Sequence, residues 1–470
     1  MPLVLGVASS PRGATVELRD SDDGRVYGTG RGSVPVDAVS TVEQDPALWW
    51  QALVDARHDA GGALGIAGIA VAATVPGLVL VDANGRLLRP ARLPGGRAAE
   101  PDVRALVDRL GPTDWCAATG SVPDAAAAIA QLAWLRRSEP DAYARVAGVL
   151  APPDWLTFRL GRRAVTDRGA ASTTGFWSPR EEQWRADLLA LVDDQRDWGA
   201  CLPRVIAPGE PAGDRDGVLI AAGTGDVMSA AVGLGLAPHD VGISLGSPSA
   251  VFALRERPTA DRTGSVRGFA GVSQFLPCAP TLDVDTAIGS FTRLLGVERT
   301  HFDRLALHAP LGANGMVFVP PARTGGTGAL AGIPDDVGPE LIARAVLEGV
   351  ACAVLDALDD LRAADVPIGG TLSLIGDPTP SRAFAQLLAD LAQRPVAVPT
   401  GDRVATGACV LAASVVTGRP ADEVAAAWRL GEARVFEPDA RALGADVRAQ
   451  VQHAWARVRG DERDAPEGST

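Results

Sequence analysis

The chain has 470 residues, with 57 acidic and 44 basic side chains and a formal net charge of -13 at pH 7. This acidic balance, without basic runs, argues against nucleic acid or an anionic membrane as a partner and favours a small-molecule ligand. Every basic residue is arginine, which excludes mechanisms that need a lysine Schiff base or a Walker A lysine.

The cysteines and the chain length indicate the compartment and the number of domains. The five cysteines are far apart in the sequence and predict neither a disulfide framework nor a CxxC metal site. We therefore expect a reducing, cytoplasmic location. A chain of 470 residues exceeds the usual size of one hydrophobic core, so two domains are expected.

The predicted elements alternate between strands and helices, which is typical of an α/β protein. The first is a β-hairpin over residues 3–18, "LVLGVASSPRGATVEL", in which a Gly/Ser/Pro turn joins two apolar β-prone runs. The start of the chain has no basic n-region, so we expect no signal peptide. Residues 63–81 carry no charge and could nearly span a bilayer, but Pro76-Gly77 divides them and predicts two buried strands. Further strands are predicted near residues 147–160, 217–222, 316–320 and 371–376, and helices near residues 47–58, 123–137, 339–363 and 381–393.

One carboxylate, Asp226, stands between a glycine turn and a run of small residues in "AAGTGDVMSAAVGLG" (221–235). Aspartate is a preferred helix N-cap, and the residues after it can form a helix, so a purely structural role is one interpretation. The other interpretation is a functional acid, which the rest of the chain must support.

The hairpin pattern of residues 3–18 occurs again in "DVGISLGSPSAVFAL" (240–254), about half a chain later. Such a repeat indicates a duplicated α/β domain, with the boundary near residues 236–240. Small-residue hairpin turns on two such domains are suited to hold nucleotide phosphates on backbone N–H groups in a cleft. The polar residues 461–470 are expected to be a disordered tail.

Stretches over nearly the whole chain resemble, in their order and spacing, the FGGY carbohydrate kinases and, within them, the xylulokinase group. The resemblance implies two duplicated ribonuclease-H-like domains of the actin/hexokinase type around a central cleft. It places a sugar-side domain at residues 1–238 and a nucleotide-side domain at residues 239–460. The stretches include "VEQDPALWWQAL" (42–53), "LRPARL" (88–93), "EPDAYARVAGVLAPPDWLTFRLGRRAVTD" (139–167), "GTGDVMSAAVGLG" (223–235), "PELIARAVLEGV" (339–350) and "LSLIGDPTPSRAFAQLLADLAQRPV" (372–396).

The resemblance also implies an activity and a set of site residues. The activity is transfer of the γ-phosphate of ATP, with Mg²⁺, to a hydroxyl of a ketopentose or related polyol. Asp226 matches the general base that takes the proton of that hydroxyl. Substrate contacts are implied for Thr74, Val75, Pro76 and Gly77, where "TVPG" replaces the family's "QMHG", and for Arg97. Nucleotide contacts are implied for Gly246, Ser247, Gly376, Asp377 and Ser381.

Several positions depart from the family pattern. In the first hairpin Ala8 stands where the family has the aspartate that organises metal and phosphate, so no metal ligand is assigned. Pro11 replaces a threonine and Pro248 interrupts the second hairpin, and proline has no N–H to offer a phosphate. These losses leave a second interpretation open, a weak or inactive kinase paralogue that binds a sugar or a partner as a sensor.

Simpler interpretations also stand beside some of these residues. Trp49 and Trp50 are interpreted as core rather than as walls of a sugar cleft. Arg97 is equally compatible with a solvated loop, and Asp377 with a cap for the helix that starts at Ser381. The expected partners are a sugar and a nucleotide, without nucleic acid or membrane; the oligomeric state stays open, with a homodimer as one alternative.

Overall fold

The computed structural model describes residues 2–62, 65–246, 249–321, 327–376, 381–439 and 444–463. The chain forms two compact units. The first unit comprises Met1–Pro238, Ala253–Pro277 and Gly401–Gly431, and the second comprises His239–Phe252, Cys278–Thr400 and Glu432–Thr470. The chain first leaves the first unit after Pro238, inside the predicted boundary region, but it returns twice. The two continuous domains, 1–238 and 239–460, stay a prediction.

A mixed seven-stranded sheet in the order β13-β14-β5-β1-β2-β3, with β15 also paired to β5, forms the centre of the first unit. Strands β1, β2 and β3 are antiparallel neighbours, whereas β5 is parallel to β1, and β14 and β15 are parallel to β5. The predicted hairpin over residues 3–18 is confirmed. The strands are β1 (Leu3–Ser10), β2 (Gly13–Asp20), β3 (Val26–Ser33), β5 (Ile66–Ala73), β13 (Gly213–Arg215), β14 (Val218–Ile220) and β15 (Thr224–Gly225).

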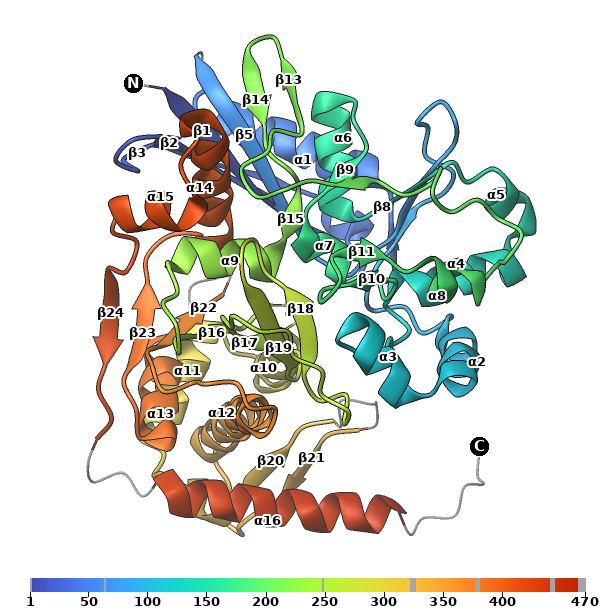
Figure 1. The fold of residues 1–470 in the computed structure, drawn as a ribbon. Helices are drawn as coiled ribbons and strands as arrows, with labels where there is room; N and C mark the ends of the chain where they lie inside the picture. The colour runs from blue at the N-terminus through green and yellow to red at the C-terminus, as the bar shows by residue number, and fades with distance from the viewer. Residues whose placement is uncertain are drawn as a thin grey trace. The chain divides into compact units, whose positions relative to one another are not determined.

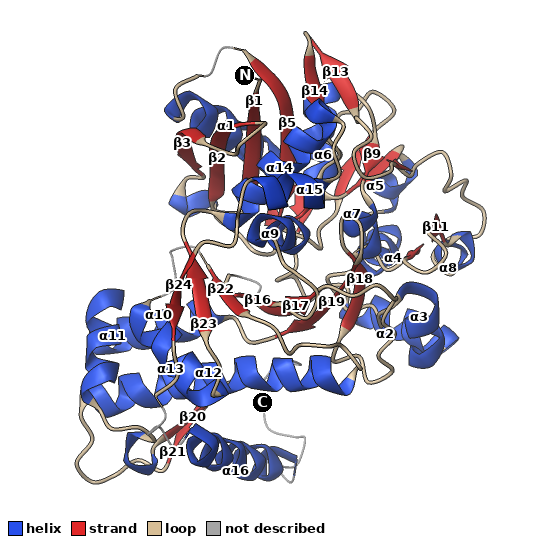
Figure 2. Cartoon of the chain, turned by 60° about the vertical axis from the view of Figure 1, so that its left-hand side comes forward, coloured by secondary structure: helices blue, strands red, loops and turns tan. Residues whose placement is uncertain are grey.

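Helices cover both faces of this sheet (Figure 2). Smaller elements extend the unit: the strand pairs β4–β7, β6–β8, β9–β12 and β10–β11, and strand β18. The helices are α1 (Pro46–Asp59), α2 (Glu100–Leu110), α3 (Pro112–Thr119), α4 (Ala128–Ser138), α5 (Pro140–Ala144), α6 (Pro152–Gly161), α7 (Arg168–Ser172), α8 (Ala186–Ala190), α9 (Asp226–Leu234), α14 (Arg403–Thr417), α15 (Ala421–Ala427) and the 3₁₀ turn η1 (Val36–Ala38). The smaller strands are β4 (Glu43–Gln44), β6 (Val79–Val81), β7 (Ala91–Arg92), β8 (Gly148–Leu150), β9 (Val165–Thr166), β10 (Trp177–Ser178), β11 (Gln183–Trp184), β12 (Arg204–Val205) and β18 (Arg267–Ala270).

Alternate side chains of β1 enter two cores on opposite faces of the sheet, as the two-residue period of a strand requires. Leu5 packs in the core that contains Trp49 of α1, whereas Val4 packs in the core formed with α14. Gly6 permits this second contact, because a Cβ there would lie 2.3 Å from the carbonyl oxygen of Ala405. Figure 1 shows α14, from late in the sequence, beside β1 and β5. The returning segment 401–431 therefore completes the core of the first unit.

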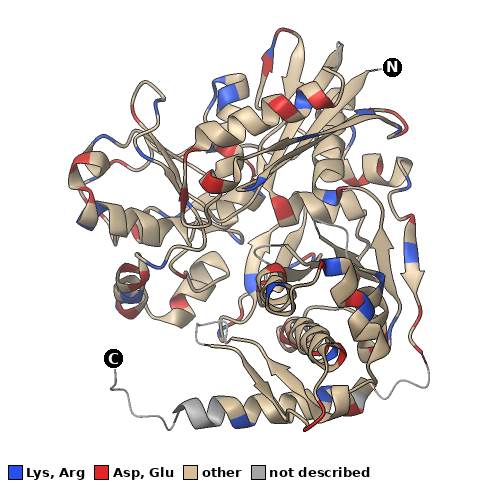
Figure 3. Ribbon diagram, turned by 180° about the vertical axis from the view of Figure 1, so that it is seen from behind, with Lys and Arg blue, Asp and Glu red and all other residues tan. Residues whose placement is uncertain are grey.

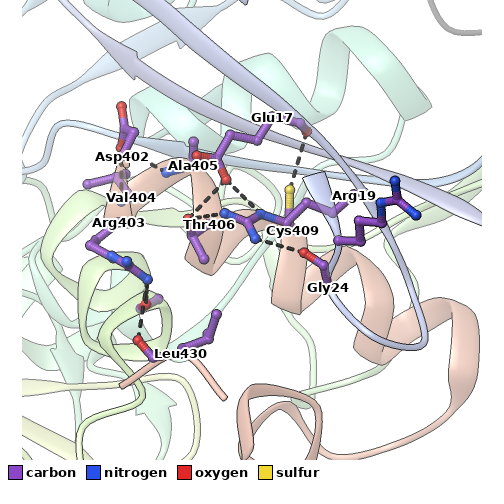
Figure 4. Close-up of polar contacts among 12 residues, drawn as sticks. Glu17, Arg19, Gly24, Asp402, Arg403, Val404, Ala405, Thr406, Cys409 and Leu430 are labelled. Atoms are coloured by element: carbon purple, nitrogen blue, oxygen red, sulfur yellow. Dashed lines mark hydrogen bonds and ion pairs between the residues drawn. The ribbon is translucent and has the colours of Figure 1, made fainter. Parts of the chain in front are cut away.

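A buried polar network joins β2 to α14 (Figure 4). Oε2 of Glu17 accepts hydrogen bonds from Nε of Arg19 at 2.8 Å and from the Thr406 hydroxyl at 2.9 Å. Arg19 also donates to the Thr406 hydroxyl at 3.0 Å and to the Gly24 carbonyl at 2.8 Å. The Cys409 thiol donates to the Glu17 carbonyl at 3.3 Å. Because these buried groups satisfy one another, the network fixes how α14 seats on the sheet.

The second unit is built on a sheet that runs through β19-β17-β16-β22-β23-β24. Strands β16 and β22 are parallel, as are β22 and β23, whereas β17 and β19, and β23 and β24, are antiparallel. The strands are β16 (Val241–Ser244), β17 (Ala250–Ala253), β19 (Phe275–Pro280), β20 (Val317–Val319), β21 (Ala329–Ala331), β22 (Leu372–Ile375), β23 (Val396–Pro399) and β24 (Ala433–Phe436). The helices are α10 (Val284–Leu295), α11 (Arg299–His308), the 3₁₀ turn η2 (Ala313–Gly315), α12 (Pro339–Ala363), α13 (Arg382–Ala392) and α16 (Gly444–Arg463).

The two sheets share one strand order, which confirms the predicted duplication. In each unit three consecutive neighbours (β1, β2, β3 and β16, β17, β19) are followed by a parallel strand next to the first of them (β5 and β22). A second parallel strand (β14 and β23) and an antiparallel edge strand (β13 and β24) complete both sheets. One difference is that β13 precedes β14 in the chain whereas β24 follows β23.

The predicted positions of most other helices and strands were correct. Helices α1, α12 and α13 and strands β14, β20 and β22 lie where they were predicted, and the predicted helix near 123–137 is α4. Trp49 and Trp50 both pack in the core of the first unit, as interpreted. Figure 3 shows arginines intermixed with acidic residues along the helices and strands, in line with the absence of basic runs from the sequence.

Two predictions were wrong. Residues 147–160 were predicted as a strand, but β8 ends at Leu150 and α6 follows. Pro152 and Pro153 start that helix, where a missing N–H costs nothing, and the Asp154 carboxylate accepts the Ala151 N–H at 3.1 Å. The predicted tail 461–470 is helical at its start, because α16 extends to residue 463; residues 464–470 lie outside the described part.

No single helix in the described ranges is long and apolar enough to cross a bilayer. Helices α14 and α15 pass such a test only as a pair bent by 112°, and α14 is part of the core of the first unit.

Candidate active site

Three parallel strands of the first unit have their carboxyl ends side by side, and these ends form the edge of the sheet at which distant residues meet. Strands β1 and β15 both pair with β5, so that Ala8 and Thr224 are each in register with Ala72. Thr74 directly follows β5, and Asp226 directly follows β15. Because neighbouring strands lie about 4.8 Å apart, the ends of β1 and β15 are roughly 10 Å apart across β5. Ala8, Thr74 and Asp226 therefore share this edge.

Asp226 is the first residue of α9, and Gly225 occupies the N-cap position. Its Oδ1 accepts a hydrogen bond from the Val227 backbone N–H at 2.9 Å. The Thr74 hydroxyl and the Val75 backbone N–H also bond to the carboxyl and lower its pKa, but burial outweighs them and raises the pKa of Asp226 to about 6. Because Gly225 is the cap, the interpretation of Asp226 as the N-cap is wrong.

This environment gives Asp226 the properties of a general base. With a pKa of about 6 the group is mostly ionised at neutral pH, yet it accepts a proton more readily than an ordinary surface aspartate. The residue as a whole is half-buried.

The predicted substrate segment forms a buried wall next to Asp226. Thr74, Val75, Pro76 and Gly77 are all buried, and a Cβ on Gly77 would lie 2.7 Å from Cγ of Pro152. Pro76 borders a small pocket, whose cavity volume is about 20 Å³. The polar side chains that line this pocket are those of Thr119, Ser121, Asp124, Ser172, Thr173 and Arg267.

Arg97 lies on an exposed loop just before α2. Its Nε donates to Oε1 of Glu100 at 2.5 Å, and the arginine side chain is 65% exposed. The structure thus gives Arg97 a surface ion pair, and its contact with a substrate stays a prediction.

The predicted nucleotide residues of the second unit follow two adjacent parallel strands. Gly246 comes after β16 and Gly376 comes after β22, and the Leu245 N–H donates to the Ile375 carbonyl at 2.9 Å, so the two glycines share one sheet edge. Ser381 is the N-cap of α13, where its hydroxyl accepts the Phe384 N–H at 3.1 Å. Ser247, Pro248 and Asp377 lie outside the described residues.

Comparison with known proteins identifies the lineage. The description "FGGY family of carbohydrate kinases, N-terminal domain" matches residues 24–233, and the C-terminal domain of the same family matches residues 302–415. A xylulose kinase from Streptomyces coelicolor is 36% identical over 453 residues, which cover 93% of this chain and 92% of that protein. The chain belongs to the FGGY family of carbohydrate kinases.

Solved structures agree with this assignment. The crystal structure of a xylulose kinase from Bifidobacterium adolescentis superposes with a TM-score of 0.79 at 28% identity, covering 96% of this chain and 99% of that one. A second, from Brucella ovis, gives a TM-score of 0.85 at 25% identity over 98% of this chain and all of that one. The duplicated, actin/hexokinase-like fold of this FGGY kinase is thereby confirmed, and its family implies ATP as the phosphoryl donor.

The family also implies a divalent metal, and position 8 of this FGGY kinase offers no ligand for one, because Ala8 contributes only a methyl group. Magnesium is held by one or two carboxylates together with phosphate oxygens and water. The carboxylates described at the edge formed by β1, β5 and β15 include Asp226 and Asp167, which accepts the Thr224 hydroxyl. No group of three or more His, Cys, Asp or Glu side chains in the described ranges could hold a metal ion.

Sequence reasoning missed a residue that positions the Asp226 turn of this kinase. The Asp167 carboxylate caps α7 by accepting the Ala170 N–H at 2.7 Å, and it accepts the Thr224 hydroxyl at 2.7 Å. Burial raises the pKa of Asp167 to about 6. The acid that closes "VTD" before a small-residue helix is a cap signal, but nothing in the sequence connects it to Thr224.

Proposed function

We propose that this protein is an ATP-dependent carbohydrate kinase of the xylulokinase type, which transfers the γ-phosphoryl group of ATP to a hydroxyl of a ketopentose or a related polyol. The observation that carries the proposal is the setting of Asp226: a half-buried residue whose carboxyl has a pKa of about 6, directly beside the Thr74 wall. The 36% identity to a protein named xylulose kinase supports the choice of sugar class.

The chemistry assigned to the first unit is one proton transfer. The ionised Asp226 accepts the proton of the sugar hydroxyl as the oxygen of that hydroxyl forms a bond to the γ-phosphorus. The bond between that phosphorus and the bridging β–γ oxygen breaks, and ADP leaves with the electron pair. Thr74 and Val75 hydrogen-bond to Asp226 and so hold the carboxylate in place while the proton moves.

The small pocket near Pro76 is lined by polar side chains, of which Asp124 pairs with Arg267 and the Thr119 hydroxyl donates to the Trp115 and Ser121 carbonyls. We propose that this polar wall helps to orient the sugar hydroxyls. We include Val75, Pro76 and Gly77 as the buried floor of this site. Mg²⁺ belongs to the proposal only as the usual companion of ATP, and no step is assigned to it.

We further propose a cytoplasmic location and no macromolecular partner beyond, at most, a second copy of the chain. The five cysteines are buried and none of them forms a disulfide, which suits a reducing compartment.

The test is a coupled ADP-release assay of the wild-type protein with ATP, MgCl₂ and a panel of ketoses and polyols. We expect turnover with a ketopentose, and a loss of at least about a hundredfold in kcat for Asp226→Asn, since general-base assistance is worth about 10²–10⁴-fold. Asp45→Asn, which changes an exposed helix cap in the same unit, is the matched control. Wild-type protein without turnover on any sugar would favour the inactive paralogue.

A further inference from the structure

A surface hollow of the first unit lies outside the site around Asp226. Its cavity volume is about 400 Å³, which is within the range of pockets that bind small molecules. Helices α2 and α4 and the residues that follow α8 surround it (Figure 1). Its charged lining residues are Asp102, Arg109, Arg136 and Arg137.

Helix α4 separates this hollow from the proposed sugar wall. Ala127, the N-cap residue of α4, borders the small pocket beside Pro76. Arg136, near the other end of the same helix, borders the hollow. An α-helix rises about 1.5 Å per residue, so Ala127 and Arg136 lie roughly 13 Å apart along it. The hollow is therefore a different place from the Asp226 site.

The lining of the hollow carries a net positive charge. Three arginines, Arg109 of α2 and Arg136 and Arg137 of α4, are opposed there by one carboxylate, that of Asp102. The chain as a whole has a net charge of -13. A positive lining is a local exception on such a molecule, and it attracts anions.

Two of the guanidiniums are held side by side. Nη1 of Arg109 donates to the Leu191 carbonyl at 2.8 Å, and Nη1 of Arg136 donates to the Val192 carbonyl. Consecutive Cα atoms are about 3.8 Å apart, so the two cations lie within roughly 10 Å of each other. Nη2 of Arg136 also lies 3.8 Å from Oδ1 of Asp193, and the arginine side chain is 50% exposed. A guanidinium has five N–H donors, so these contacts leave others for a ligand.

The end of a helix accounts for only part of this arrangement. Leu191 and Val192 directly follow α8, and a cation is favourable beside the carbonyls at a helix C-terminus. One arginine meets that need, whereas two like charges held together repel each other. A dianion between them removes the repulsion. A phosphate group suits this position, because two of its oxygens match the planar fork of arginine.

The third arginine is held by an acid. Nε and Nη2 of Arg137 donate to the two carboxylate oxygens of Asp102, each at 2.8 Å. The Arg137 side chain is 56% exposed, whereas that of Asp102 is 9% exposed. Asp102 therefore lowers the positive charge of the hollow and occupies the fork of Arg137. Removal of this carboxylate should strengthen the attraction for an anion.

The hollow also has an apolar wall. Leu106, Ala133 and Leu191 line it, and all three pack in the core beneath α2 and α4. An inorganic phosphate bound by the arginines would leave this wall in water, whereas a phosphate that carries a carbon skeleton covers it. The volume and the wall together favour a ligand of the size of a sugar phosphate.

We propose that this hollow is a second ligand site, which binds a phosphomonoester of sugar-phosphate size through Arg109 and Arg136. The site goes beyond the proposed function and does not depend on it, because its residues are separate from those around Asp226.

The experiment is calorimetric titration of the full-length protein with ribose 5-phosphate and, separately, with inorganic phosphate, in a buffer of low ionic strength. We expect a Kd for ribose 5-phosphate below about 1 mM, and weaker binding of inorganic phosphate. Arg109→Gln and Arg136→Gln should each weaken binding of ribose 5-phosphate by at least about tenfold, the usual effect of losing a charge-assisted hydrogen bond. Asp102→Asn should tighten it by about threefold or more, because it releases Arg137 and removes a negative charge.

Arg104→Gln is the matched control. It removes an exposed arginine of α2 from a position outside the lining of the hollow, and it should leave the Kd unchanged. Thermal unfolding of each variant shows whether it is folded. The gain expected for Asp102→Asn is a result that a purely structural role of the arginines would not give.

Three results would overturn the proposal: wild-type protein that does not bind ribose 5-phosphate, binding that both Arg109→Gln and Arg136→Gln leave unchanged, or weaker binding by Asp102→Asn. The second result would place the phosphate elsewhere, as at the proposed active site. Absence of sugar-kinase turnover with binding in the hollow intact would count against the proposed function alone.

Discussion

Replacing Asp226 by asparagine should make the folded protein more stable at neutral pH while it removes activity. Burial holds the pKa of Asp226 at about 6, whereas the ordinary value is 3.8. The folded state thus binds this proton more tightly than the unfolded state does. The associated stability is present below pH 3.8 and is lost as the pH rises through 6.

The size of the effect follows from the two pKa values. A difference of this size corresponds to about 3 kcal/mol at pH 7, which is an upper limit because the residue is only half-buried. We expect Asp226→Asn to raise the free energy of unfolding by about 1–3 kcal/mol at pH 7 and by almost nothing at pH 4. Asparagine retains one oxygen that can accept the Val227 N–H, whereas its NH₂ group cannot accept the Val75 N–H, and this loss offsets part of the gain.

The measurement is urea unfolding of both proteins at several pH values between 4 and 8. Asp45→Asn, at the exposed N-cap of α1, should change stability by less than about 1 kcal/mol at each pH. An Asp226→Asn protein that is destabilised at pH 7, or whose difference from the wild type does not depend on pH, would show that the carboxylate is structural and refute the argument from burial.

Three other predictions concern the base, the β2–α14 network and a helix crossing. Wild-type kcat/KM should rise with pH through about 6, because Asp226 must lose its proton before it can act; a profile flat from pH 5 to 7 would contradict this. Thr406→Val should lower the free energy of unfolding by about 1–3 kcal/mol, because it removes one hydrogen bond from Glu17 and one from Arg19 in a buried network. Urea unfolding beside Thr417→Val, on the last turn of the same helix, measures it. Gly407→Ala should cost several kcal/mol of stability or prevent folding, because its Cβ would lie 1.8 Å from the Ser229 carbonyl oxygen of α9. The control is Gly289→Ala in α10, where the Cβ would meet only the end of the Arg293 side chain at 3.4 Å. This variant should be neutral or stabilising in the same assay.

The sequence predicted the duplicated sheets well because their signals are local. The Gly/Ser/Pro turn between two apolar runs at residues 3–18 can be recognised without any distant contact. The same is true of the helical spacing of apolar residues along the 25 residues of α12. The error at residues 147–160 is also local in origin. "DWLTFRL" is rich in β-prone residues, which favours a strand. The two prolines just before it favour the first turn of a helix, and the helix forms.

The composition of the two units was beyond such reasoning. Segment 401–431 joins the first unit through contacts such as Thr406 with Glu17, which lie 389 residues apart in the chain. The same holds for Asp167 and Thr224: each side chain reads as an ordinary turn residue, and only the fold brings them within 2.7 Å. The role proposed for Asp226 came from a family resemblance, because the local pattern alone is equally typical of a helix start.

The separation of β1 from β15 explains how the chain can keep a base while it lacks a metal ligand. Because the two strands lie on either side of β5, a carboxylate at position 8 would be roughly 10 Å from Asp226. At that distance the loss of one charge changes the other only weakly, and the pKa of Asp226 follows from burial and its own hydrogen bonds. The proton transfer proposed for Asp226 therefore does not depend on a carboxylate at position 8.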